Sequence, residues 1–147
     1  MERISYIEDY ETWKKDFRFS TTIRVRFSET DLFGHMNNVS AFIYFEQARI
    51  EFLHHIGLTL SSENEGIPIV ADLQCDFHQQ IYFNDPIKIF VKANHVGRSS
   101  IDLHYMVLNE KEEICLTGRG ALVYIDQINQ RPIQIPQNMA EKLQKGQ

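Results

Sequence analysis

One segment constrains the fold of this 147-residue chain more than any other: a polar, turn-rich stretch that passes directly into the only long helical pattern. It reads SETDLFGHMNNVSAFIYFEQARIEFL, residues 28–53. Apolar residues with helical spacing predict a helix over residues 39–56, with Gly57 as its C-cap. Asn37 or Asn38 is suited to be the N-cap. The polar stretch before the helix also holds Asp31, Gly34 and His35.

Almost all of the remaining chain has the alternating pattern of β-strands. Short turns separate the strands, and such turns suit antiparallel neighbours, because parallel strands need long crossovers. The pattern therefore predicts an α+β fold, with one antiparallel sheet wrapped around one long central helix. The predicted strands cover residues 21–27, 67–83, 87–96, 100–108 and 114–125.

The length predicts a single domain over residues 1–147. Residues 1–18 form an N-terminal extension with a short amphipathic helix predicted over residues 5–16, and residues 132–147 form a C-terminal tail that ends in a short helix. The net charge of −5 argues against general nucleic-acid binding, which needs a basic surface. Since we find neither a membrane-length apolar run nor a signal peptide, we expect a cytoplasmic protein that does not bind membranes.

Two charged residues, Glu46 and Arg49, fall on or beside the apolar side of the predicted helix. They are three residues apart and can form an ion pair. A structural pair, buried or at a subunit interface, is the simpler interpretation. The alternative is a carboxylate held near a reaction centre.

The predicted helix has more apolar surface than one sheet face requires. Val39, Ile43 and Ile50 flank its polar stripe instead of joining its main apolar side. This pattern indicates a second contact surface, and hence a homo-oligomer.

The polar stretch before the helix could form a catalytic site. The first N–H groups of a helix lack internal partners and attract negative charge, so they could stabilise an oxyanion. Asp31 could attack a carbonyl directly or activate a water molecule. His35 and Asn37 could orient the water, the substrate or Asp31. Turn chemistry alone also explains each of these residue types.

The segment VRFSETDLFGHMNNVSAFIYFEQARIEFL resembles the signature of the hot-dog-fold acyl-CoA thioesterases, the 4-hydroxybenzoyl-CoA thioesterase-like family. The resemblance implies homodimers or homotetramers with active sites at a subunit interface. It implies that Asp31 is the catalytic carboxylate and that the thioester carbonyl points at the helix N-terminus near Asn38. The segment is also similar to the plant acyl-carrier-protein thioesterases, although Phe33 stands where those enzymes carry an asparagine.

The resemblance also implies a binding site for the phosphates of coenzyme A. By position, Arg98, Ser99 and Ser100 are the candidates. Glu46 is a second candidate carboxylate, because a related branch of hot-dog enzymes places its catalytic glutamate on the central helix.

These features predict a thioesterase that hydrolyses an acyl-CoA or acyl-carrier-protein thioester. Coenzyme A is expected only as part of the substrate, with no separate cofactor, and the histidines lack metal-site spacing. Two alternatives stay open: a hydratase or dehydratase of acyl thioesters on the same fold, and a non-catalytic acyl-CoA-binding module.

Overall fold

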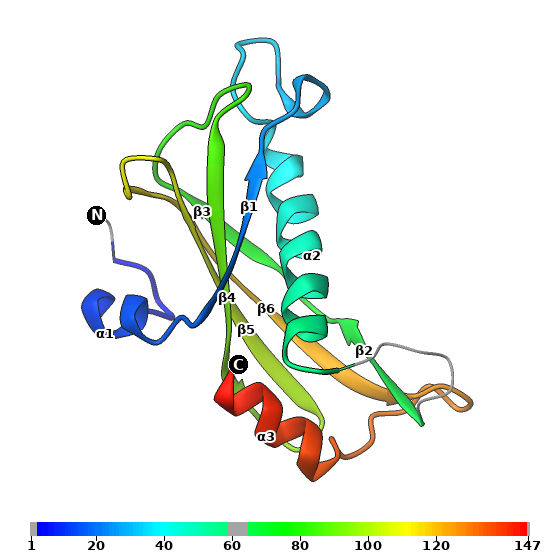
Figure 1. Ribbon diagram of the computed structural model, residues 1–147. Helices are drawn as coiled ribbons and strands as arrows, with labels where there is room; N and C mark the ends of the chain where they lie inside the picture. Colours follow the sequence, from blue (N-terminus) through cyan, green and yellow to red (C-terminus); the bar gives the residue numbers. More distant parts are fainter. Residues whose placement is uncertain (1–2, 59–64, 147) are drawn as a thin grey trace.

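The computed structural model describes residues 3–58 and 65–146, which form one sheet, a long helix and two shorter helices (Figure 1). The helices are α1 (Tyr10–Lys15), α2 (Asn38–His55) and α3 (Gln137–Lys145), with a short 3-10 helix, η1 (Phe27–Glu29). The strands are β1 (Phe19–Arg24), β2 (Gly66–Val70), β3 (Gln74–Phe77), β4 (Pro86–Val96), β5 (Ser100–Leu108) and β6 (Ile114–Asp126). The predicted α+β architecture is confirmed.

All strand pairs in the described part of the chain are antiparallel, in the order β1-β4-β5-β6-β2. β3 also pairs with β6, so β2 and β3 follow one another along the same edge of the sheet. The predicted single strand over residues 67–83 is therefore wrong. The chain leaves the sheet between β2 and β3, where the side chain of Asp72 accepts a 2.7 Å hydrogen bond from the backbone of Ala121.

Helix α2 lies along one face of the sheet (Figure 1). Its predicted N-cap is confirmed, since Oδ1 of Asn37 accepts a hydrogen bond from the N–H of Val39 at 3.0 Å. The helix ends just before Gly57, whose φ of +87° is readily adopted by glycine. These two signals set the length of the helix.

The main core lies between α2 and the sheet. Phe45 of α2 is fully buried and stacks on Tyr105 of β5, with ring centroids 4.4 Å apart. Gly118 of β6 permits this approach, because a Cβ at that position would lie 2.5 Å from the Phe45 ring. A glycine in a strand interior thus marks the place where the helix comes closest to the sheet.

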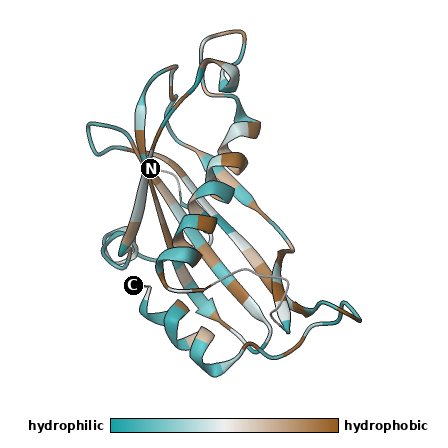
Figure 2. Cartoon of the chain, turned by 45° about the vertical axis from the view of Figure 1, so that its right-hand side comes forward, coloured by the Kyte–Doolittle hydropathy of each residue, from teal (hydrophilic) through white to brown (hydrophobic). Residues whose placement is uncertain are grey.

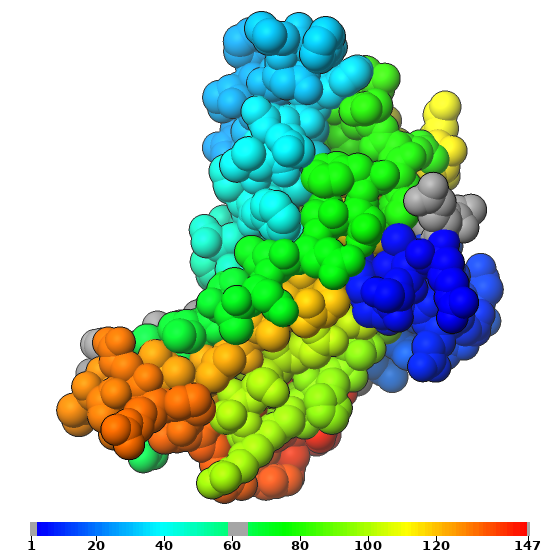
Figure 3. All heavy atoms as spheres, turned by 180° about the vertical axis from the view of Figure 1, so that it is seen from behind, coloured from blue at the N-terminus to red at the C-terminus, as the bar shows by residue number. Residues whose placement is uncertain are grey.

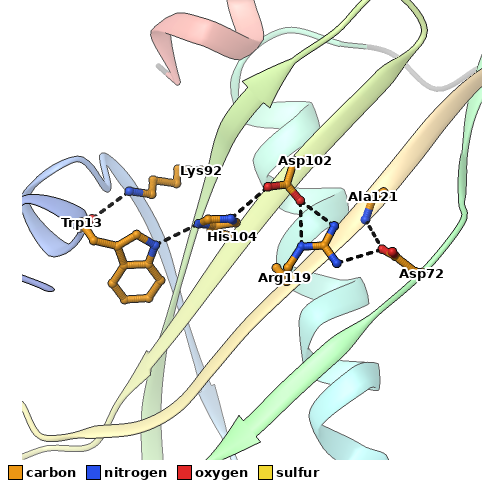
Figure 4. Close-up of polar contacts among 7 residues, drawn as sticks. All are labelled: Trp13, Asp72, Lys92, Asp102, His104, Arg119 and Ala121. Atoms are coloured by element: carbon orange, nitrogen blue, oxygen red, sulfur yellow. Dashed lines mark hydrogen bonds and ion pairs between the residues drawn. The ribbon is translucent and has the colours of Figure 1, made fainter. Parts of the chain in front are cut away.

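The N-terminal extension covers part of the other face of the sheet (Figure 3). Trp13 of α1 is buried there and donates to His104 of β5, while Lys92 of β4 donates to the carbonyl oxygen of Trp13 at 2.8 Å (Figure 4). The helix in this extension is shorter than predicted, because Asp9 caps it at Thr12. Both faces of the central strands are therefore buried.

The first strand also ends earlier than its alternation predicts. Phe27, the last residue of the predicted strand over residues 21–27, lies in η1 and is 77% exposed. A carboxylate oxygen of Glu29 accepts from the backbone N–H of Arg26, which turns the chain out of the strand. After this turn the chain enters the polar stretch that leads to α2.

Candidate active site

The polar stretch between β1 and α2 folds into a narrow hairpin. At its base, the N–H of Asn37 donates to the carbonyl of Glu29 at 2.7 Å. Nearer the tip, the N–H of Asp31 donates to the carbonyl of His35 at 2.8 Å. Gly34 closes the tip with a φ of +79°, a conformation that side chains with a Cβ rarely adopt. The hairpin holds Asp31 above the N-terminus of α2.

The carboxylate of Asp31 is oriented by its own hairpin. Its Oδ1 accepts from the backbone N–H groups of Phe33, at 2.8 Å, and His35, at 3.1 Å. Within the described residues Oδ2 accepts no hydrogen bond, so it stays available to a ligand. Phe33, which departs from the plant-type pattern, contributes its backbone N–H to Asp31, and its side chain is exposed.

The N-terminus of α2 offers one backbone donor to the same region. The N–H of Val39 is used by the Asn37 cap, and the N–H of Ser40 donates to the carbonyl of Asn37 at 2.9 Å. The N–H of Asn38, at the first helical position, has no acceptor in the parts of the chain that are described, as the geometry of a helix start requires. The side-chain oxygen of Asn37 serves the helix cap, so its predicted role in orienting a reactant stays a prediction.

A cavity of about 370 Å³ lies beside these groups. Asp31, His35 and Asn38 form one wall, and the segment that follows β3 forms the other. The lining combines apolar and polar side chains. Its further residues are Met36, Phe77, His78, Gln79, Gln80, Ile81 and Leu116.

The far wall of this cavity was not predicted as part of a site. The alternation over residues 67–83 hid it, since it predicted one continuous strand. The only hint was Gln79, a polar residue on the face of the alternating pattern that otherwise carries Cys75, Phe77, Ile81 and Phe83. In the structure, the backbone N–H of Met36 donates to the carbonyl of Ile81 at 2.6 Å, which brings this wall against the hairpin.

The second candidate carboxylate, Glu46, does not line this cavity. Its side chain is 64% exposed, and one oxygen lies 3.9 Å from a guanidinium nitrogen of Arg49. Arg49 is buried and donates to the hydroxyl of Tyr105 at 3.2 Å. The structural interpretation of this pair agrees with the geometry better than a catalytic one.

The candidate residues for coenzyme A, Arg98, Ser99 and Ser100, lie at the far end of the sheet from Asp31. β4 starts beside the end of β1 and runs for 11 residues before it reaches this turn, a span of roughly 35 Å. The carbonyl of Arg98 accepts from the N–H of Ile135, just ahead of α3. One chain therefore does not bring these residues to Asp31.

The described residues contain no cluster of three or more His, Cys, Asp or Glu side chains that could hold a metal ion. None of the helices formed by residues 3–58 and 65–146 is long and apolar enough to cross a membrane.

Sequence comparisons agree with the fold. The sequence model of the thioesterase-like superfamily matches residues 25–143. The protein YsmA of Bacillus subtilis (strain 168) is 40% identical over 126 residues, or 85% of each chain. The chloroplastic acyl-acyl carrier protein thioesterase ATL3 of Arabidopsis thaliana is 29% identical over 126 residues, which are 82% of this chain and 64% of that one.

Solved structures of similar proteins have the same fold. A thioesterase from Thermus thermophilus, complexed with coenzyme A and zinc, is 28% identical with a TM-score of 0.76, over 86% of this chain and 98% of that one. The DHNA-CoA thioesterase from Staphylococcus aureus is 26% identical with a TM-score of 0.73, over 78% of each chain. The chain therefore belongs to the thioesterase-like superfamily: it has the hot-dog fold and is a thioester hydrolase.

Proposed function

We propose that this enzyme hydrolyses acyl-CoA thioesters with Asp31 as the reacting carboxylate and without a cofactor beyond the coenzyme A of the substrate. The proposal rests on one observation. Asp31, whose Oδ2 accepts no hydrogen bond from the described residues, and Asn38, whose backbone N–H donates none to them, line the same cavity. The names of the relatives support the substrate class, because one is a thioesterase for DHNA-CoA and another was solved with coenzyme A. Acyl-carrier-protein thioesters are the second substrate to test, given the relative from Arabidopsis.

The arrangement suits the chemistry of a thioester. The carbonyl oxygen would accept from the N–H of Asn38, where the helix dipole stabilises developing negative charge. The leaving thiolate needs little protonation, so the site requires no strong general acid. His35, on the cavity wall, would contact the reacting water or the substrate.

Two reaction routes use the same geometry. As a general base, Asp31 takes a proton from water while the water oxygen bonds to the carbonyl carbon, and the carbon–sulfur bond then breaks to release the thiolate. As a nucleophile, Asp31 bonds to the carbonyl carbon and expels the thiolate, and water then hydrolyses the mixed anhydride. A single turnover in H₂¹⁸O separates the routes, since hydrolysis of the anhydride at the carboxyl of Asp31 leaves ¹⁸O in the protein.

The function is tested with a panel of short, long and aromatic acyl groups on coenzyme A and on acyl carrier protein, with free thiol as the readout. Asp31→Asn and Asp31→Ala should lower kcat by at least about 100-fold. Glu141→Gln, which removes an exposed carboxylate of α3, is the matched control and should keep full activity. Wild-type protein that releases no thiol from any member of the panel would contradict the proposal.

We also propose a homodimer, or a homotetramer built from such dimers. Val39, Ile43 and Ile50 of α2 are 62%, 50% and 49% exposed, and Ile69 and Val70 of β2 are each 42% exposed. Figure 2 shows hydrophobic positions recurring along the length of α2. So much exposed apolar surface, on α2 and on an open edge of the sheet, favours a protein partner.

A second copy of the chain fits this edge for a geometric reason. A two-fold axis joins equivalent strands antiparallel, so each copy presents its Arg98 end beside the other copy's Asp31 end. The dimer would thus bring together the two halves of the predicted site that one chain keeps apart. A cytoplasmic location stays a prediction, and we further propose a role in lipid metabolism.

The dimer is tested by the mass of the protein in solution. Ile43→Asp, on the exposed side of α2, should convert the assembly to monomers and raise KM for acyl-CoA. Ile128→Asp, at a position that is 95% exposed, is the matched control and should keep the wild-type mass. A monomeric wild-type enzyme with full activity would rule out the shared site.

A further inference from the structure

Glu29 is a buried carboxylate two residues before Asp31. It is only 6% exposed, yet it is not in the wall of the cavity. The Arg26 guanidinium donates to both of its oxygens, through Nη2 at 2.9 Å and Nε at 3.2 Å, and the backbone N–H of Arg26 donates at 3.0 Å. These hydrogen bonds from Arg26 hold the pKa of Glu29 below its ordinary value, so the buried group is ionised at neutral pH.

The same residue joins the hairpin to helix α2 through two side chains of the helix, Tyr44 and Ser40. The hydroxyl of Tyr44, in the second turn of the helix, donates to Oε1 of Glu29 at 2.8 Å. The carbonyl of Glu29 accepts from the N–H of Asn37 at 2.7 Å and from the hydroxyl of Ser40 at 3.5 Å. Both the side chain and the backbone of one residue therefore join the hairpin to the helix.

The hydrogen bonds within the hairpin do not fix its orientation relative to α2. The bonds from Phe33 and His35 fix the carboxylate of Asp31 relative to the hairpin, and they would persist if the whole hairpin tilted. What such a tilt would change is the distance between Asp31 Oδ2 and the N–H of Asn38. Asp31 Oδ2 and the N–H of Asn38 must both reach the same thioester carbonyl. A misplacement of about 1 Å can lower the rate about 100-fold.

We propose that Glu29 is a positioning residue: through Arg26 and Tyr44 it sets the hairpin on α2 so that Asp31 and the N–H of Asn38 face the same thioester carbonyl. This inference rests on the proposed function of Asp31. Glu29 itself touches no reactant. It acts on the orientation of the reacting groups and not on the affinity for the substrate.

Glu29→Gln keeps the shape of the side chain and removes its charge. We expect kcat to fall by about 100-fold while KM stays within about threefold of wild type. Tyr44→Phe removes only the 2.8 Å bond to the helix and should give a smaller loss of kcat, about tenfold, so the inference stays testable if the first variant folds poorly. Binding of a non-hydrolysable thioether analogue should be unchanged in both.

A matched control separates positioning from a general loss of stability. Asp102→Asn weakens a shielded ion pair with Arg119 on the other face of the sheet. It should lower the urea midpoint of unfolding and leave kcat at the wild-type value. A similar loss of kcat in this control would overturn the inference.

The decisive measurement is a double-mutant cycle with Asp31→Asn. If Glu29 acts through Asp31, Glu29→Gln will not lower the residual rate of the Asp31→Asn enzyme any further. A further drop of about 100-fold in that background, or wild-type kcat for Glu29→Gln alone, would overturn the role of Glu29 and leave the proposed function standing. Full activity of Asp31→Asn would instead remove the proposed function itself.

Discussion

The indole Nε1–H of Trp13 donates a 2.9 Å hydrogen bond to Nδ1 of His104, across 91 residues of sequence. Since Nδ1 accepts, Nε2 of His104 carries the proton and donates to Asp102 at 3.0 Å (Figure 4). Asp102 also accepts from Arg119 at 2.7 Å, and Arg119 pairs with Asp72 at 3.2 Å. A connected polar network thus fastens the N-terminal extension to the outer face of the sheet.

Trp13→Phe should lower the free energy of unfolding by about 2–3 kcal/mol. The variant leaves the buried Nδ1 of His104 without its donor and removes part of a packed side chain. Urea unfolding followed by circular dichroism measures the loss. Because Trp13 is the only tryptophan, its fluorescence in the wild-type protein also reports directly on whether the extension is docked.

Tyr10→Phe is the control for that experiment. The buried hydroxyl of Tyr10 has no hydrogen-bond partner within the described residues, so its removal should be neutral or stabilising. If Trp13→Phe and Tyr10→Phe have equal effects, the bond to His104 contributes nothing.

Asp102 should make the stability depend on pH in the acid range. Burial alone would raise its pKa, but the hydrogen bonds from His104 and Arg119 outweigh burial and lower it. A lowered pKa in the folded state means that the stabilising contribution is complete above the ordinary value of about 3.9 and is lost as the pH falls below it. Asp102→Asn should therefore cost about 1.5–3 kcal/mol at pH 7. In urea titrations, the difference in the free energy of unfolding between Asp102→Asn and wild type should shrink between about pH 5 and about pH 3, as linkage predicts. A difference that stays constant would show that the carboxylate charge does not contribute.

Gly118→Ala should destabilise the core by about 1–3 kcal/mol, because the new methyl group would overlap the Phe45 ring. Phe45→Leu in the same chain should recover part of this loss, since it removes the ring that the methyl group meets. Thermal unfolding of the two single variants and the double variant gives the coupling. If the losses of stability from Gly118→Ala and Phe45→Leu are additive, the strain does not come from the contact between the new methyl group and the Phe45 ring.

Gly34→Ala tests the tip of the hairpin that carries Asp31. Nothing lies within 4 Å of the added methyl group, so the cost comes from the φ of +79° alone, about 1–2 kcal/mol. We expect a small loss of stability and a clear loss of kcat as Asp31 shifts. Gly34→Asn is the matched control and should retain more activity, because asparagine tolerates positive φ better than alanine.

The elements with strong local signals were predictable from the sequence alone. The spacing of apolar residues and the cap at Asn37 specified α2, and short turns between alternating segments specified an antiparallel sheet. The signature around Asp31 was sufficient to indicate the family, because its residues are close together in the sequence.

Features that depend on contacts between distant segments could not be predicted from the sequence and are seen only in the folded chain. The break between β2 and β3 depends on Asp72 bonding to Ala121, and the cavity wall after β3 is placed by the contact between Met36 and Ile81. Tyr44 meets Glu29 only when α2 forms and the hairpin folds back on it. Local sequence patterns do not indicate such pairs, because hydrogen bonds and packing between distant segments form only when the chain folds.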